Sequence, residues 1–388
     1  MLHQRLKYLC CWWGIKILVS NAAIKLLIAA SGTGGHVFPG IAVAQKLSGY
    51  QIEWLGVPDR LESKLVPKEY PLHLIRVGGF QGKPGIGTLK TIGGLIKGTF
   101  QVRKLLKQGH FDAVFSTGGY ISAPAILAAY SLGLPVFLHE SNAIPGKVTR
   151  WLSYFCTKVA IGFVETGKYL PRAKTIYLGT PCRQQFLTPQ SLDLPISETS
   201  PLIVVVGGSQ GAVALNQMIR ECVNTWLDAG ATIVHIVGGA NASTETIAHP
   251  QYIVLPFYEN MAGLFQRADL AISRAGAATL NELMITRTPS ILIPYPYAAE
   301  DHQYYNANVL AAADGALLFR QENLTAQFLA GEVLNLLQNP QRLKMMASNT
   351  SSLGVINSAD LLADLIGESV KARSIPPRVD RPASDTKG

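Results

Sequence analysis

The 388-residue sequence lacks several patterns that mark common types of site. Its five cysteines are odd in number and show no Cys-x-x-Cys spacing, which argues against a disulfide framework and a zinc site and fits a reducing cytosol. It contains no Gly-Lys-Ser/Thr ending of a P-loop and no Asp-x-Asp pair that would hold a metal-bridged diphosphate. We therefore expect no metal and no other cofactor. Charge on a phosphate leaving group would be stabilised by helix N-termini and an arginine.

Charged residues are also scarce, at 15% of the chain, and their signs are segregated. Residues 1–183 carry a net charge of +15, residues 184–370 carry −9, and residues 371–388 carry +3. A uniformly basic nucleic-acid binder would not divide its charge in this way, so no nucleic-acid partner is expected. The division predicts a first half attracted to an anionic surface and an acidic second half that stays away from it.

The N-terminal residues 1–23 differ from the rest of the chain. Their apolar run, residues 8–19, is well short of the ~20 residues that a membrane helix needs, and Lys16 interrupts it. We predict a mobile or interfacial extension. A cleaved signal peptide, with residues 20–23 as its cleavage site, is the alternative.

A strand followed by a glycine-rich turn begins the folded part of the sequence. Leu26–Ala30 is continuously apolar, which is typical of a strand buried on both faces. Ser31–Gly35 then predicts a sharp turn that leads into a helix with an apolar face at Ile41, Val43, Ala44 and Leu47. Such a turn binds anionic or hydroxylated ligands in α/β proteins, and His36 would face the ligand. A turn used only for packing is the alternative, because the third glycine of Gly-x-Gly-x-x-Gly is missing.

The same theme recurs after the proline-containing linker of residues 188–201. Residues 202–206 predict a second buried strand, and residues 207–212 a second glycine turn. We therefore predict an α/β protein with two Rossmann-like, doubly wound lobes and a cleft between them. The predicted parts are an extension (1–23), a first lobe (24–183), a second lobe (184–352), a helix packing back on the first lobe (353–370) and a disordered tail (371–388).

Residues 86–107 predict a helix of unusual character. Its apolar residues are spaced mostly by three or four, and its charged residues are all basic: Lys90, Lys97, Arg103, Lys104 and Lys107. Packing in the core is one interpretation of the apolar stripe. The single sign of the charge equally favours contact with an anionic membrane surface.

Eight segments in order closely resemble the MurG family of bacterial N-acetylglucosaminyltransferases, and the resemblance runs from about residue 24 to 367. The segments are Gly32–Gly40, Gly118–Tyr120, His139–Asn142, Gly179–Arg183, Gly207–Gly211, Arg274–Ala277, Glu282 and His302–Ala307.

The resemblance implies an inverting glycosyltransferase of the GT-B fold. It would transfer GlcNAc from UDP-GlcNAc to the C4 hydroxyl of the N-acetylmuramyl sugar of lipid I, an undecaprenyl diphosphate, and so produce lipid II for peptidoglycan synthesis, cell shape and division. The basic first lobe would bind lipid I on the anionic cytoplasmic leaflet of the bacterial plasma membrane as a peripheral protein. The acidic second lobe would bind UDP-GlcNAc. Further cell-wall synthesis proteins would be partners.

Roles for single residues follow from the matched motifs. His36 resembles the proposed general base, a task that the near-neutral titration of histidine suits. A structural or acceptor-binding role is the alternative. Thr33, Gly34 and Gly35 would line the cleft. The expected donor-site residues are Asn142 and Gln303 for the GlcNAc hydroxyls, Arg183 and Ser209 for the diphosphate, Glu282 for the ribose, Tyr258 for uracil through its backbone, and the segment Ala277, Ala278, Thr279, Leu280 and Asn281.

Two departures from the family pattern occur. Ser31 brings a side chain to a position where glycine is usual, and Thr180–Cys182 replaces the common Asn-Pro-Val. The nearest rival is a UDP-galactose-dependent diacylglycerol glycosyltransferase of the same superfamily, which should differ at residues 118–120 and 139–142. A non-catalytic membrane-docking or nucleotide-sensing scaffold need not keep His36, Arg183, Glu282 and Gln303 together. A nicotinamide oxidoreductase is a weaker rival because of the missing third glycine.

Overall fold

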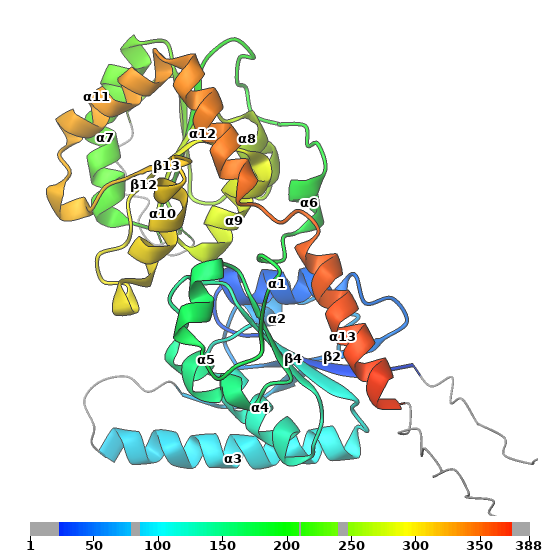
Figure 1. The fold of residues 1–388 in the computed structure, drawn as a ribbon. Coiled ribbons are helices and arrows are strands. Elements are labelled where there is room, and N and C mark those ends of the chain that lie inside the picture. Colours follow the sequence, from blue (N-terminus) through cyan, green and yellow to red (C-terminus); the bar gives the residue numbers. More distant parts are fainter. Residues whose placement is uncertain (1–22, 79–85, 209–210, 240–246, 375–388) are drawn as a thin grey trace, which may run out of the picture.

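The computed structural model describes residues 23–78, 86–208, 211–239 and 247–374, apart from the side chains of residues 86–90. Two lobes are stacked one on the other, and each consists of a parallel sheet with helices on both faces (Figure 1). The predicted α/β class with two doubly wound lobes is confirmed. The predicted extension, apart from residue 23, lies outside the described residues.

The first lobe contains a seven-stranded sheet in the order β3-β2-β1-β4-β5-β6-β7. All pairs in it are parallel. Its strands are β1 Lys25–Ala29, β2 Gln51–Gly56, β3 Leu72–Leu74, β4 Ala113–Ser116, β5 Val136–Glu140, β6 Lys158–Ile161 and β7 Thr175–Tyr177. Its helices are α1 Gly34–Ala44, α2 Glu62–Leu65, α3 Ile86–Gln108, α4 Ser122–Ser131 and α5 Lys147–Leu152, with the 3₁₀ turns η1 Ser153–Phe155 and η2 Val164–Tyr169.

The continuous apolar run of β1 is explained by the two cores it serves. Leu26 and Ile28 pack into one cluster with α1, whereas Leu27 and Ala29 pack into another with α3 and α4. Successive side chains of a strand point to opposite faces, so a strand covered on both faces has no polar face. β1 therefore lies in the middle of the lobe and carries the first glycine turn to the carboxyl end of the sheet.

The second lobe repeats this architecture with a six-stranded parallel sheet in the order β10-β9-β8-β11-β12-β13. Its strands are β8 Leu202–Val206, β9 Thr232–Ile236, β10 Tyr252–Leu255, β11 Leu270–Ser273, β12 Ser290–Leu292 and β13 Ala316–Leu318. Its helices are α7 Val213–Asp228, α8 Met261–Arg267, α9 Ala277–Thr286, α10 His302–Ala312, α11 Ala326–Leu337 and α12 Pro340–Ser352, with the turns η3 Ala299–Asp301 and η4 Gln321–Asn323. α6 Gln184–Leu187 follows the first lobe and leads into the linker.

The last helix, α13, returns from the second lobe to the first (Figure 1). Its buried residues Leu362 and Ile366 belong to the same core cluster as α1, and Lys46 Nζ lies 3.0 Å from Asp360 Oδ1. The helix spans Ser358–Ser374, so the predicted helix at 353–370 is misplaced at both ends and the predicted tail starts too early. The physical reason for the later end is that no helix breaker occurs before the prolines at 376 and 377.

Two elements of the first lobe are short. β3 ends at Leu74 after three residues. α2 begins only at Glu62, because Asp59 before it has a φ of 62°, which is outside the helical region. No helix among the described residues is long and apolar enough to cross a membrane.

Candidate active site

The glycine turn after β1 is held by a buried carboxylate. Gly32 has a φ of +106°, a conformation that side chains disfavour. Glu62 of α2 has no exposed surface and accepts hydrogen bonds from Ser31 Oγ (2.5 Å), Gly32 N (3.1 Å) and Val57 N (2.7 Å). The hydroxyl of Ser31, a departure from the family pattern, thus helps to fix the turn. The sequence gives no signal for Glu62, because its partners lie in other segments.

His36 lies in the first turn of α1, and its ring is fixed in one orientation. Its Nδ1 is 2.7 Å from the carbonyl oxygen of Thr117. Since a carbonyl only accepts, Nδ1 is the donor, and in the neutral imidazole Nε2 is then the accepting nitrogen. This tautomer is the one that a general base requires.

Gly118 and Gly119 of the second motif pack directly on this ring. A Cβ at Gly118 would lie 3.3 Å from His36 Cε1, and one at Gly119 would lie 3.6 Å from His36 Cδ2. Both glycines also have positive φ, +93° and +77°. Positive φ therefore explains both glycines, and at Gly118 the close approach of the histidine ring is a second reason, whereas a Cβ at Gly119 would make ordinary contact with the ring.

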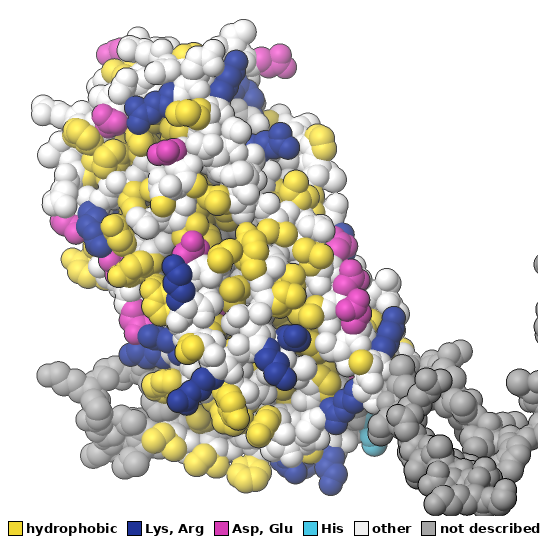
Figure 2. All heavy atoms as spheres, in the orientation of Figure 1, with side chains coloured by type: hydrophobic (Ala, Val, Ile, Leu, Met, Phe, Trp, Pro, Cys, Tyr) yellow, Lys and Arg dark blue, Asp and Glu magenta, His cyan; other side chains and the backbone are white. Residues whose placement is uncertain are grey.

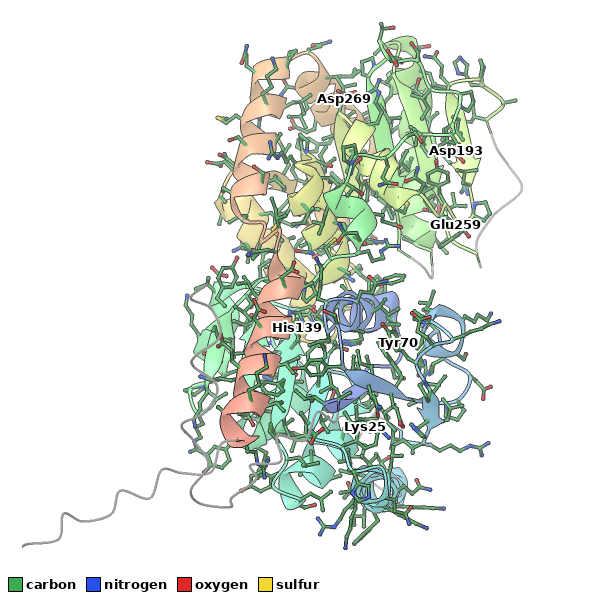
Figure 3. All side chains as sticks on the ribbon, turned by 90° about the vertical axis from the view of Figure 1, so that its right-hand side faces the viewer. Lys25, Tyr70, His139, Asp193, Glu259 and Asp269 are labelled. Carbon is green, nitrogen blue, oxygen red and sulfur yellow. The ribbon has the colours of Figure 1, made fainter. Side chains whose placement is uncertain are left out.

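His139, at the end of β5, is a buried histidine. Figure 3 shows it in the first lobe, toward the junction with the second lobe. Its Nε2 lies 3.0 Å from the carbonyl oxygen of Gly179, to which it donates, and burial lowers the pKa of His139 to about 4. The side chain therefore stays uncharged at neutral pH and holds β5 against the segment that leads to Arg183.

Asn142 follows β5 and has both ends of its carboxamide bound. Its Nδ2 donates to Glu140 Oε1 at 3.0 Å, and its Oδ1 accepts from Nδ2 of Asn306 at 3.1 Å. Asn306 belongs to α10 of the second lobe. The predicted sugar-binding residue of the first lobe thus lies at the interface between the lobes.

The second lobe contributes the N-terminus of α9. Its cap residue, Gly276, has no side chain, and no acidic residue stands in the first turn. A Cβ at Gly35 of α1 would lie 3.9 Å from the Cβ of Ala278, so the first turns of α1 and α9 face each other across the lobes. The first turn of each helix carries unpaired backbone N–H groups, which favour an anion near this junction. Of the predicted α9 residues, Leu280 is buried in the core and Asn281 Nδ2 donates to Thr180 O at 2.9 Å.

Arg183 and Glu282, which the resemblance assigns to two parts of the nucleotide, form an ion pair with each other. Arg183 Nη2 lies 2.9 Å from Glu282 Oε1, and the guanidinium stacks 4.3 Å from the ring centroid of Phe38. Burial raises the pKa of the Glu282 carboxyl, while the charge and hydrogen bond of Arg183 oppose the shift. The pair joins the first lobe to α9.

The remaining predicted site residues are Gln303, Tyr258 and Ser209. Gln303 Oε1 accepts hydrogen bonds from Ala275 N (3.2 Å) and Tyr295 N (3.0 Å), which leaves its amide hydrogens directed elsewhere. The hydroxyl of Tyr258 donates to Asp193, at the edge of the second lobe labelled in Figure 3. Ser209 lies outside the described residues. No group of three or more His, Cys, Asp or Glu that could hold a metal ion occurs in the described part of the chain.

Comparison with known proteins places this chain in a family. Residues 26–161 match the glycosyltransferase family 28 N-terminal domain and residues 202–362 its C-terminal domain. The UDP-N-acetylglucosamine--N-acetylmuramyl-(pentapeptide) pyrophosphoryl-undecaprenol N-acetylglucosamine transferase of Trichodesmium erythraeum is 57% identical over 360 residues, covering 93% of this chain and 96% of that protein. The same transferase of Rippkaea orientalis is 59% identical over 347 residues, 89% of this chain and 99% of its own.

The chain belongs to the MurG family within glycosyltransferase family 28. The crystal structure of MurG from Acinetobacter baumannii is similar with a TM-score of 0.70 and 31% identity, covering 89% of this chain and 99% of that one. A glycotransferase of kitacinnamycin shares the fold at a TM-score of 0.70 with only 14% identity. The resemblance to MurG and the GT-B architecture are confirmed, and the chain is a glycosyltransferase.

Proposed function

We propose that this chain transfers GlcNAc from UDP-GlcNAc to the C4 hydroxyl of the N-acetylmuramyl sugar of lipid I and so forms lipid II. The observation that carries this proposal is the 57% identity, over 93% of the chain, to a transferase named for that donor and that acceptor. The UDP-galactose-dependent diacylglycerol transferase is not favoured, since the relatives named above are GlcNAc transferases.

The geometry around His36 suits a single inverting displacement. Nε2 takes the proton of the acceptor hydroxyl while the oxygen attacks C1 of GlcNAc. The bond between C1 and the diphosphate breaks on the opposite face, and UDP leaves with the bonding electrons. The N-terminus of α9 stabilises the charge that develops on the diphosphate. Thr33, Gly34 and Gly35 lie between donor and acceptor.

The donor is held by the second lobe and by two residues at the interface. Glu282 accepts hydrogen bonds from the ribose hydroxyls, and Arg183 exchanges its partner Glu282 for the diphosphate, together with the Ser209 turn. Asn142 and the amide hydrogens of Gln303 bind the sugar hydroxyls. The backbone at Tyr258 meets uracil. This arrangement is supported by the 2.9 Å ion pair, which brings the two charged residues of the donor site together.

The first lobe rests on the cytoplasmic leaflet of the plasma membrane through α3. Ile92, Ile96 and Phe100 recur every four residues on this helix and are 40%, 54% and 68% exposed. Lys97 and Lys104 beside them are also exposed. α3 lies at the edge of the first lobe farthest from the second lobe, where Figure 2 shows hydrophobic and basic side chains together. An exposed apolar row flanked by lysines binds anionic lipid surfaces.

The reaction is tested directly with purified protein, a lipid I analogue in detergent and one of two donors, UDP-GlcNAc or UDP-galactose. Turnover with UDP-GlcNAc alone, unchanged by a chelator of divalent cations, is the expected result. Preference for UDP-galactose would overturn the donor assignment. Loss of activity with the chelator would overturn the metal-free displacement.

A further inference from the structure

One buried carboxamide, that of Asn306, connects both lobes at the proposed sugar site. Asn306 has no exposed surface. Its Oδ1 accepts from the backbone nitrogen of Ala143 at 2.8 Å, in the first lobe. Its Nδ2 donates to the carbonyl oxygen of Ala275 at 3.2 Å, in the second lobe, and to Asn142 Oδ1 at 3.1 Å. Every hydrogen of this amide group is therefore used.

The orientation of the Asn306 amide is determined by backbone groups whose polarity is fixed. The N–H of Ala143 can only donate, and the carbonyl of Ala275 can only accept. A flipped amide would place nitrogen against N–H and oxygen against carbonyl. Asn306 must therefore present an N–H to Asn142.

Asn142 is oriented from its other end as well. Glu140 is an acceptor, and its Oε1 receives Asn142 Nδ2 at 3.0 Å. Its Oε2 accepts from Gly146 N at 3.1 Å and from Thr149 Oγ1 at 2.7 Å, which holds the carboxylate in place. A donor on one side and an acceptor on the other permit a single orientation of the Asn142 amide. One hydrogen and one lone pair of that amide are left in defined directions.

We infer that Asn306 is a positioning residue that orients the amide of Asn142 toward the GlcNAc moiety. It does so only when the two lobes are in the relative position that brings Asn306 to Ala143 and Asn142. The inference rests on the proposed sugar-binding role of Asn142. It goes further in assigning the recognition of the sugar to a pair contributed by both lobes. In the proposed arrangement uridine and ribose make no contact with Asn142 or Asn306. Substitution of Asn306 should therefore weaken the recognition of the GlcNAc moiety and leave the affinity for UDP unchanged.

The test is N306D, which keeps the size of the side chain. Its carboxylate still accepts from Ala143 N but opposes the oxygens of Asn142 and Ala275. We expect kcat/KM for UDP-GlcNAc to fall by about 10- to 100-fold, whereas the inhibition constant of UDP changes less than about threefold. N142A should lose a similar factor, and the double variant should lose little more than either single variant, because the two residues act as one unit.

The matched control is N216D in the second lobe. Asn216 is also buried, and its Nδ2 donates to the carbonyl oxygen of Val237 at 2.9 Å. N216D should lose stability while the ratio of kcat/KM for UDP-GlcNAc to the affinity for UDP stays unchanged. If N306D does not fold, N306A takes its place in the test. N306A removes the donor without adding a charge, and it should lower the same ratio about 10-fold.

The outcomes separate this inference from the proposed function. If N142A keeps full kcat/KM, the sugar-binding role of Asn142 itself is wrong. If N142A is impaired but N306D or N306A behaves like N216D, or if the losses of N142A and N306D simply multiply, the positioning role of Asn306 is overturned.

Discussion

The two lobes share an architecture and differ in chemistry. Each winds a parallel sheet outward from a central strand, β1 or β8, and each follows that strand with a glycine turn and a helix. Residues 1–183 nevertheless carry +15 and residues 184–370 carry −9. In the first lobe the glycine turn leads to a fixed histidine, whereas the second contributes an uncapped helix N-terminus and the Glu282 carboxylate, for which we propose ribose binding. The fold is common, and the division of labour comes from side chains at the carboxyl ends of the strands.

The largest effect on this comparison is expected from removing the proposed base, His36, from the first lobe. We expect His36→Ala to lower kcat by about 10²-fold or more and to leave the affinity for UDP nearly intact, since in the proposed mechanism Nε2 acts only on the acceptor hydroxyl. Steady-state kinetics and UDP titration measure both effects. His249→Ala, at an exposed histidine of the second lobe, is the control. Unchanged turnover would remove His36 from the chemistry.

The corresponding change in the second lobe is Glu282→Gln. Losing a charged acceptor for the ribose hydroxyls should raise the KM for UDP-GlcNAc by about 10- to 100-fold. A 2′-deoxy-UDP inhibitor sharpens the test, because the wild type should bind it less tightly than UDP and the variant should hardly distinguish the two. Glu221→Gln, at an exposed glutamate of the same lobe, should change neither value. Discrimination that survives in Glu282→Gln would contradict the ribose assignment.

The charge division itself can be tested on vesicles. Reversing Lys90, Lys97 and Arg103 of α3 together should weaken binding to anionic vesicles by at least about 10-fold, at roughly 1 kcal/mol for each basic residue near the surface. Turnover of a water-soluble acceptor analogue should be retained. The matched variant reverses Arg220, Arg342 and Lys344 of the second lobe and should bind as the wild type does. Equal vesicle binding by both triple variants would mean that α3 is not the interfacial helix.

In acid, by contrast, the two lobes should lose stability for the same reason. Burial lowers the pKa of His139 in the first lobe and of His235 in the second to about 4, from the ordinary value of 6.5. Below pH 6.5 the unfolded chain therefore binds more protons than the folded chain. The part of the free energy of unfolding that depends on these neutral histidines is fully present above pH 6.5 and is lost as the pH falls toward 4. Each histidine contributes on the order of 3 kcal/mol at most. Chemical denaturation from pH 7.5 to 5 should show the loss, and His235→Gln should reduce it by about half. An unchanged slope in that variant would contradict the prediction for His235.

The sequence was most informative where neighbouring residues determine the structure. The apolar run before Ser31, the recurrence of a glycine turn after residue 206 and the helical spacing of α3 each predicted the element that is observed. The edge strands β7 and β13 were not predicted, since each has only three residues and its pairing depends on the sheet beside it.

The contacts that shape the site could not be predicted, because they join distant segments. Ser31 meets Glu62 from 31 residues away, Arg183 meets Glu282 from 99, and Asn142 meets Asn306 from 164. Resemblance supplied the residues of the site one by one. Their hydrogen-bond partners, and therefore the tautomer of His36 and the orientation of Asn142, came from the arrangement in space.

Titration of UDP into three proteins, the wild type, His36→Ala and Glu282→Gln, tests the central claim most directly. If the second lobe holds the nucleotide and the first supplies the base, His36→Ala will bind UDP within about threefold of the wild type, whereas Glu282→Gln will bind at least about 10-fold more weakly. Loss of UDP affinity in His36→Ala together with its retention in Glu282→Gln would contradict the assignment of donor and base to separate lobes.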